Sequence, residues 1–309
     1  MDRDARDNRA AAMLSVASNA LLTVAKFVVG LVTGSVAVLS DAANSAGDLV
    51  ASGIAFAGVR AASRPADEDH PYGHEKSENL AALVEGVLVL AAGAAVVVEA
   101  TRRLVDGSAG LVSVDLAVGV MVASALVNLA VSARLRRVAR RTGSPAIAAD
   151  AAHLASDVWT SAGAAAGLVV VAATGWTRVD AAVGVAIALY VVFVGGRIAW
   201  TAAQVLIDRA LPDEEIAIVE GVLARFARAD GVGFHAVRGR RAGAKRHIDL
   251  HMVVPPDTTV RDGHMLGGRV KTAIRRELPG SEVLIHLEDH GPLGPAPAGA
   301  AITAAKGGP

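Results

Sequence analysis

The sequence predicts a bundle of six membrane-spanning helices followed by a small α+β domain, and three observations lead to this fold class. Hydrophobic residues make up 53% of the 309 residues and charged residues 19%, whereas a typical soluble domain carries about 25% charged residues. The mean hydropathy is +0.44, and the apolar residues gather in long runs before Pro212. After Pro212 the pattern changes to amphipathic helices and alternating strands.

The apolar runs are each close to the roughly 20 residues that a helix needs to cross a membrane. Turn or charged residues separate them, and the prolines lie outside their interiors, as expected of helix boundaries. The runs are Ala12–Leu31, Val36–Val59, Leu80–Val98, Val114–Val131, Ala146–Ala173 and Ala181–Ile207.

Lysines and arginines between the runs predict the orientation, because cytoplasmic loops are enriched in them. They gather in the N-terminal tail and in the second and fourth breaks. This places both termini in the cytoplasm and predicts a multi-pass protein of the cell (inner or plasma) membrane. We expect four segments: a cytoplasmic tail at 1–11, a transmembrane domain at 12–211, a cytoplasmic domain at 212–290 and a disordered tail at 291–309.

The cytoplasmic segment predicts the element order αββαβ. Helical periodicity covers Asp213–Ala229 and Thr259–Leu278. Residues 233–240, 245–254 and 281–288 alternate like strands, with a turn at 241–244 between the first two. This order within about eighty residues is typical of a two-layer, ferredoxin-like α+β domain.

The charge balance and the cysteine content exclude several classes of function. The 30 basic and 30 acidic residues balance, so no overall field attracts a nucleic acid. The chain has no cysteine, so a metal ion must be held by His, Asp, Glu or Asn side chains. The phosphate-binding motif GxxxxGK[ST] is missing, which indicates an ion gradient as the driving force of any transport.

Charged residues inside the predicted spans are the most informative feature. Two triplets with the spacing i, i+3, i+7 each lie on one helix face. They are Asp41, Asn44 and Asp48 in the second span, and Asp150, His153 and Asp157 in the fifth. A charge at the membrane centre costs roughly 2.5–3.5 kcal/mol, so we expect the two faces to meet each other or a water-filled cavity.

Facing each other, the triplets offer four ligands, the number that a tetrahedral divalent ion takes. The ligands are Asn44, Asp48, His153 and Asp157. Asp41 and Asp150 lie one turn away as accessory groups that could admit or orient ions. The alternatives are hydrogen bonds that pack helices together, or a proton relay without a metal ion.

Further motifs accompany the triplets in a definite order. They are Thr33-Gly34-Ser35, Leu39-Ser40-Asp41-Ala42-Ala43-Asn44-Ser45-Ala46-Gly47-Asp48, His70-Pro71-Tyr72-Gly73-His74-Glu75-Lys76, His153 with Asp157, and Asp208-Arg209-Ala210-Leu211-Pro212-Asp213-Glu214-Glu215. Together they resemble the cation diffusion facilitator family over nearly the whole chain, from the first span to Glu288. The resemblance implies a transporter rather than an enzyme. It implies a homodimer of six-span subunits that exports divalent metal ions from the cytoplasm in exchange for protons.

The family's transport site falls on the same four residues, Asn44, Asp48, His153 and Asp157. An imidazole ligand favours Zn²⁺, Co²⁺, Ni²⁺ or Fe²⁺ over Mg²⁺ and Ca²⁺. Asn44 departs from the Asp or His of many zinc-transporting relatives, and a neutral amide is a weaker ligand. We expect Zn²⁺ as substrate and regulator. The alternatives are an exporter of Mn²⁺, Fe²⁺, Co²⁺ or Ni²⁺, and a membrane metal sensor or scaffold without transport.

The resemblance implies two more features near the cytoplasmic ends of the spans. A secondary zinc site falls on Asp67, His70 and His74, where Pro71 and Gly73 require a turn to bring the histidines together. Lys76 and Asp208 correspond to an ion pair that locks the dimer. The alternatives are solvated loop histidines and ordinary anchor charges at helix ends.

Most of the histidines lie in the cytoplasmic domain. On its second strand, His247, Asp249 and His251 share a face by alternation, and a surface rich in His and acid indicates a metal site. The family's paired-ion site falls on His235, His251, His264, His286 and Glu288. Some relatives have Asp in place of Glu288.

Overall fold

The computed structural model describes residues 2–33, 36–106, 114–174 and 177–289. Within the helices some side chains, those of residues 36–44 and 160–174 among them, are not described. The chain divides into two compact units, Met1–Gln204 and Val205–Pro309, and each is described by itself. The predicted disordered tail at 291–309 lies outside the described residues.

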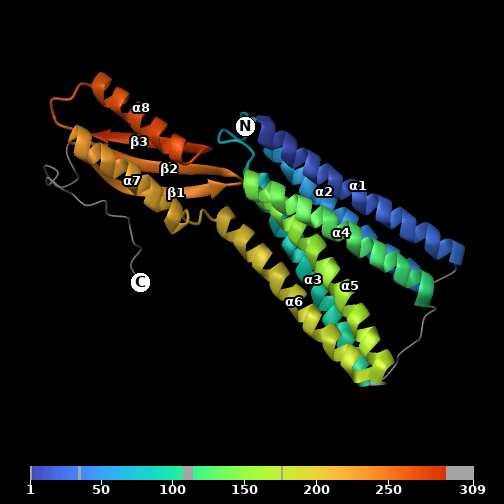
Figure 1. The fold of residues 1–309 in the computed structure, drawn as a ribbon. Helices are drawn as coiled ribbons and strands as arrows, with labels where there is room; N and C mark the ends of the chain where they lie inside the picture. Colours follow the sequence, from blue (N-terminus) through green and yellow to red (C-terminus); the bar gives the residue numbers. More distant parts are fainter. Residues whose placement is uncertain (1, 34–35, 107–113, 175–176, 290–309) are drawn as a thin grey trace. The chain divides into compact units, whose positions relative to one another are not determined.

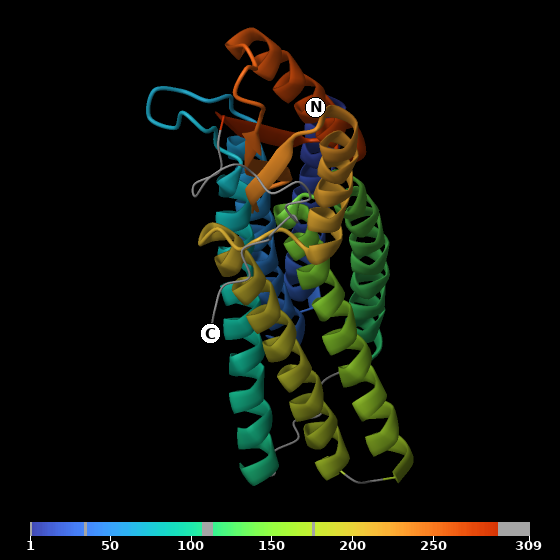
Figure 2. The same cartoon turned by 90° about the vertical axis from the view of Figure 1, so that its left-hand side faces the viewer.

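The first unit is a bundle of long helices, which Figures 1 and 2 show side by side. Helix α1 packs against α2 and α4, α2 against α3 and α5, and α5 against α3 and α4. Their bounds are α1 (Asp2–Thr33), α2 (Val36–Ala62), α3 (Lys76–Asp106), α4 (Val114–Thr142), α5 (Pro145–Thr174) and α6 (Thr177–Leu206). The mainly helical unit that the sequence predicts is therefore confirmed.

Three stretches of the described residues are long and apolar enough to cross a membrane, namely Asp4–Val29, Lys76–Ala95 and Leu189–Leu206. The other three predicted spans stay predictions. Helix α1 begins at Asp2, so it includes most of the segment that we expected to be a tail. An ion pair between Arg141 of α4 and Asp7 holds this end of α1 against the bundle.

Small residues bring α3 and α6 into backbone contact. A Cβ atom added at Gly86 would lie 2.5 Å from the backbone nitrogen of Ala199, and one added at Gly195 would lie 2.5 Å from that of Leu90. One turn before Gly86, Ala82 packs with alanines of α5 and α6. Such contacts are typical of tightly packed membrane helices.

The second unit confirms the predicted order αββαβ. Strand β2 is central, antiparallel to β1 and parallel to β3. The predicted turn at 241–244 is too long, because the β1–β2 ladder continues to the pair Ala242 and Lys245. The elements are α7 (Asp213–Asp230), β1 (Gly233–Ala242), β2 (Lys245–Val253), α8 (Val260–Glu277) and β3 (Ser281–Glu288).

The unit starts a few residues before the predicted boundary at 212, because the preceding segment joins its sheet. Leu211 lies in the core, Ala210 forms a bridge to Arg240, and Asp208 accepts a hydrogen bond of 3.2 Å from the same arginine.

The two faces of the sheet differ. Ile248, Leu250 and Met252 of β2 are buried in a core shared with α7 and α8. Alternation therefore turns the odd-numbered residues of β2 to the opposite face. Strand β1 contains a bulge between His235 and Arg238, where one extra residue opposes the partner strand.

Candidate metal centres

The first cluster lies inside the helical bundle and consists of Asp48, His153 and Asp157, which we call the transport cluster. One ligand atom of each lies within 4.8 Å of the other two. The His153 Nε2 atom is 3.3 Å from Asp48 Oδ1. His153 and Asp157 are one turn apart on α5, which packs against α2, the helix that carries Asp48. The predicted meeting of the two helix faces is therefore present at these residues.

A buried hydrogen-bond network lies beside the transport cluster. Asp150, one turn before His153, is fully buried and accepts a hydrogen bond of 3.3 Å from Ser52. Ser52 also accepts one of 2.6 Å from Asn19 and lies 3.1 Å from the Ser15 hydroxyl. Through Ser52 these hydrogen bonds connect Asp150 of α5 to α2 and α1. Asp150 lies next to the transport cluster but is not part of it.

The remaining predicted residues of the second span cannot be placed, because the side chains of Asn44 and Asp41 lie outside the described residues. Both backbones belong to α2. The described part of the cluster offers one imidazole and two carboxylates, a ligand set that suits Zn²⁺ and related ions and leaves a position open. Asn44 as the fourth ligand stays a prediction.

The second cluster is the loop cluster, Asp67, His70 and His74, and the structure brings these three predicted residues together. The expected turn is present: the Gly73 amide donates to the His70 carbonyl over 2.9 Å. The carboxylate of Asp67 lies 3.4 Å from His70 Nδ1 and 3.3 Å from His74 Nε2. A hydrogen bond from the His70 backbone amide lowers the pKa of Asp67, which keeps it ionised and ready to bind a cation.

The third cluster, which we call the sheet cluster, consists of His235, His251 and Glu288. His235 and His251 are paired across β1 and β2. Glu288 lies 2.8 Å from His235 Nε2 through one oxygen and 2.8 Å from His251 Nδ1 through the other. Burial raises the pKa of Glu288, but the two histidine hydrogen bonds outweigh it and leave the pKa below its usual value.

The other predicted ligands of the cytoplasmic domain are placed differently. His286 is paired with His251 across β2 and β3, and its Nε2 atom is 3.7 Å from Glu288, so it borders the sheet cluster. His264 is exposed on α8. Within the described residues of one chain it is not part of a metal-binding group.

Lys76 belongs to the first unit and Asp208 to the second, and their predicted ion pair stays a prediction. Within the second unit, the Asp208 carboxylate accepts the hydrogen bond from Arg240. Asp208 has a positive φ of 62°, which is uncommon outside glycine.

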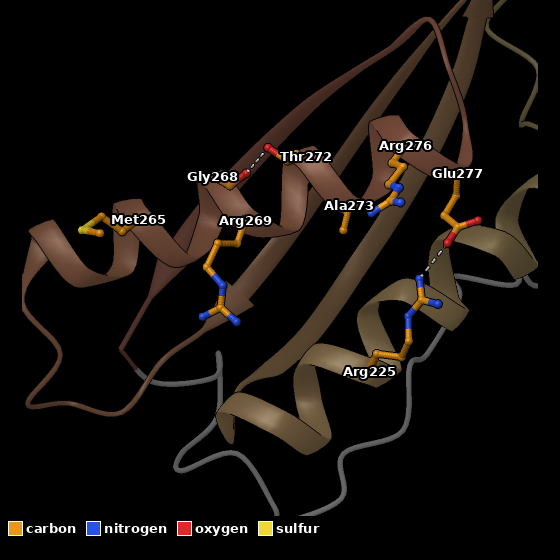
Figure 3. Close-up of a pocket in the computed structure, with 8 residues that line it drawn as sticks. All are labelled: Arg225, Met265, Gly268, Arg269, Thr272, Ala273, Arg276 and Glu277. Carbon is orange, nitrogen blue, oxygen red and sulfur yellow. Dashed lines mark hydrogen bonds and ion pairs between the residues drawn. The ribbon is translucent and has the colours of Figure 1, made fainter.

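A surface groove of about 910 Å³ lies between α7 and α8 (Figure 3). Arginines dominate its polar lining, and Arg225 donates to Glu277 across it over 3.1 Å. Arg269 is bonded to Asp230 at 3.0 Å. The groove has no histidine among its lining residues, so it does not resemble the three clusters.

Sequence reasoning missed Glu85 of α3. Its side chain is completely buried, and neither carboxylate oxygen has a hydrogen-bond partner among the described residues. Its carboxyl lies within electrostatic range of Asp150, His153 and Asp157. The signal was present, because Glu85 is an acidic residue inside the predicted third span. However, it is not part of a repeated i, i+3, i+7 triplet.

A membrane-helix bundle that encloses two carboxylates and an imidazole, joined to a small α+β domain, defines a class of protein: membrane transporters of metal cations. The family model of the cation efflux transmembrane domain matches residues 12–207, and that of the cation efflux protein cytoplasmic domain matches residues 211–290. The chain belongs to the cation diffusion facilitator family of transporters. It is thus a membrane-embedded transporter for the efflux of divalent cations and not an enzyme.

Individual relatives agree with this family assignment. The chain is 34% identical over 280 residues to the cation-efflux pump FieF of Shigella flexneri, covering 90% of this chain and 91% of the relative. The FieF pump of Escherichia coli O127:H6 is also 34% identical over the same coverage. The transporter sll1263 of Synechocystis is 32% identical over 284 residues, or 92% of this chain and 91% of the relative.

Proposed function

We propose that the chain exports Zn²⁺ from the cytoplasm in exchange for protons, and that the ion crosses the membrane through the transport cluster. The observation that carries the proposal is the convergence of Asp48, His153 and Asp157 within 4.8 Å inside the helical bundle. Mixed nitrogen and carboxylate ligands suit Zn²⁺, and they suit Mg²⁺ and Ca²⁺ less well. Asn44 would complete a tetrahedral set.

Proton exchange follows from the chemistry of the same ligands. A carboxylate or imidazole binds a metal ion only after it has lost its proton, so metal ions and protons compete for one site. A bundle that opens this site alternately to each side of the membrane then exchanges one for the other.

The assembly and its setting belong to the same proposal. We infer a homodimer in the cell membrane, with both termini and the second unit in the cytoplasm. The match to the cytoplasmic domain of cation efflux proteins supports this arrangement. The loop and sheet clusters, each with two histidines and one carboxylate, would bind regulatory Zn²⁺ outside the transport path.

The alternative substrates are Mn²⁺, Fe²⁺, Co²⁺ and Ni²⁺, because the same ligand types accept them. A sensor or scaffold without transport is less well supported, because it has no need of ionisable groups inside the membrane. Uptake into proteoliposomes over a panel of metals, with the internal pH followed at the same time, distinguishes these cases.

The site itself is tested by Asp48→Ala and Asp157→Ala. We expect each to abolish metal flux while the protein still folds and inserts, because water cannot replace a charged ligand in a buried site. Asp257→Ala, which removes an exposed loop carboxylate outside the clusters, is the control and should transport normally. Near-normal flux in either cluster variant would refute the assignment.

A further inference from the structure

A stripe of polar side chains follows one face of α1 inside the helical bundle. Its members have the spacing i, i+4, i+8 and i+11, so they share a face of the helix. Each of them is hydrogen-bonded to α2, or to a residue of α2 that is, and three of the four are buried. We call this set the α1 stripe, and it consists of Ser15, Asn19, Thr23 and Lys26.

Asn19 contacts the turn of α2 that begins at Asp48. Its side-chain nitrogen donates to the Ser52 hydroxyl over 2.6 Å and to the backbone carbonyl of Asp48 over 3.5 Å. The amide nitrogen carries two hydrogen atoms, so it can serve both acceptors at once. Asn19 therefore holds both ends of the turn from Asp48 to Ser52.

The preceding turn of α2 is held to α1 as well. The Thr23 hydroxyl donates to the Ser45 carbonyl over 3.0 Å, and the Lys26 ammonium group donates to the Ser45 hydroxyl over 2.8 Å. Lys26 and Ser45 are both buried. A buried ammonium group is costly unless it is hydrogen-bonded, so the bond to Ser45 favours one register of α1 against α2.

The position of this part of α2 decides where the Asp48 carboxylate lies. A single methylene group joins that carboxylate to the backbone, so its oxygens follow any shift of the helix. A binding site must hold its ligands to within about 0.5 Å of the productive geometry. His153, whose Nε2 atom is 3.3 Å from Asp48 Oδ1, comes from a different helix. Ser52 links the same turn of α2 to that helix, because it donates to Asp150 over 3.3 Å.

We propose that Asn19 is a positioning residue of the transport cluster, which fixes Asp48 at the distance from His153 that suits the transported ion. It thereby contributes to the affinity for Zn²⁺ and to the order of preference among metals. Asn19 acts through the backbone of Asp48 and through Ser52, because its amide nitrogen is a hydrogen-bond donor and not a metal ligand. This inference rests on the proposed function, because it concerns the same site.

The test removes the hydrogen bonds of Asn19 and measures transport. Asn19→Leu keeps a similar volume without a donor. In the full-length protein reconstituted in vesicles, we expect the Zn²⁺ concentration for half-maximal uptake to rise about tenfold, as is typical when a group that orients a metal ligand is lost. The order of uptake among Zn²⁺, Co²⁺ and Mn²⁺ should change as well.

Ser52 provides an independent check, because it accepts the shorter of the two Asn19 hydrogen bonds. Ser52→Ala should also raise the Zn²⁺ concentration for half-maximal uptake. The double variant with Asn19→Leu should be little worse than the weaker-binding single variant, because both changes remove the same link. Fully additive losses would show that Asn19 does not act through Ser52 and would overturn the proposal.

Asn128→Leu is the matched control. Asn128 is a buried asparagine of α4, and its side-chain oxygen has no hydrogen-bond partner within the described residues. Its replacement should leave the half-maximal Zn²⁺ concentration and the metal order unchanged. If the α1 stripe only packs helices together, Asn19→Leu would lower the melting temperature, and the folded protein would keep both transport properties. That result would overturn the proposal, and so would equal changes in the two leucine variants.

Two outcomes keep the proposal testable and separate from the proposed function. If Asn19→Leu does not fold, unchanged Zn²⁺ dependence of uptake in Ser52→Ala would overturn the proposal. If Asp157→Ala transports like the unaltered protein, the proposed function fails. If Asp157→Ala is inactive while Asn19→Leu keeps the normal half-maximal concentration and metal order, only the role of Asn19 fails.

Discussion

At the scale of single residues, Asn44 carries the clearest prediction about metal choice. Asn44→Asp would add a third carboxylate to a site that already holds Asp48 and Asp157. Added negative charge strengthens binding of a divalent ion but also raises the affinity for protons, because like charges disfavour ionisation. We therefore expect tighter Zn²⁺ binding above neutral pH and a steeper loss of transport as the pH falls. We also expect a changed order among Zn²⁺, Co²⁺ and Mn²⁺.

Competition uptake with the purified Asn44→Asp protein at two pH values measures these effects. If Asn44 only packs against a neighbouring helix, the substitution would mainly lower the stability of the bundle. An unchanged metal order together with an unchanged pH profile would remove Asn44 from the site.

Glu288 gives a second residue-scale prediction, because one carboxylate bridges both histidines of the sheet cluster. Glu288→Gln keeps the shape but removes the charge that binds a cation. We expect the protein to retain fewer Zn²⁺ ions per chain after gel filtration, as measured by elemental analysis, while transport continues. Glu282→Gln on the same strand, an exposed residue outside the cluster, is the control. Equal metal content in both variants would contradict a metal site here.

Single residues also show how much of the candidate site could be predicted from the sequence. Charged residues are costly in a membrane, so a repeated spacing was enough to single out Asp48, His153 and Asp157 before their contact was known. Glu85 forms no such repeat, and its complete burial depends on which helices pack against α3. His264 shows the opposite case: the resemblance assigns it to a metal site, but its position on α8 does not bring it to the sheet cluster of the same chain.

At the scale of elements, the bulge in β1 is a feature that the sequence pattern did not reveal. Strict alternation would place Phe234, Ala236 and Arg238 on one face. Instead Phe234 and Val237 are buried, and Ala236 has a positive φ of 51°. The extra residue lets both large side chains enter the core while His235 stays on the face of the sheet cluster. The other predicted strand and helix bounds of the second unit agree with the structure to within a few residues, because their periodicity is regular.

The contact between α7 and the β1–β2 hairpin predicts that the stability of the second unit depends on pH. Glu215 of α7 is bonded to Arg246, at 2.8 Å, and to Arg241. Burial raises its pKa, but these arginines outweigh the effect and lower the pKa below 4.5. A carboxylate with a lowered pKa stabilises the fold fully above its unfolded-state pKa, and this contribution disappears as the pH falls through the folded-state value.

We therefore expect Glu215→Gln to destabilise the second unit by about 1–2 kcal/mol at pH 7. The difference from the unaltered protein should shrink below about pH 4. Calorimetry of the full-length protein at pH 7 and at pH 3.5 to 4 checks both statements. Glu277→Gln removes an exposed pair with Arg225 and should change stability little. If Glu215→Gln lowers the stability equally at both pH values, the ion pairs are not the cause of the lower stability.

At the scale of the whole molecule, the two units carry separate metal-binding groups. Deleting the residues after Pro212 removes the sheet cluster but leaves the transport cluster intact. We expect lower activity and a weaker dimer with some remaining metal flux, measured by vesicle uptake and chemical crosslinking. A truncated protein that is equally active and equally dimeric would make the second unit dispensable.

The close approach of α3 and α6 has a consequence for the residues that these helices can carry. A Cβ atom at Gly86 would lie 2.5 Å from the backbone nitrogen of Ala199, and one at Gly195 would lie 2.5 Å from that of Leu90. Backbone atoms cannot give way as the end of a flexible side chain can. Even a methyl group at either position would therefore push the two helices apart and disturb the packing of Ala82 against α5.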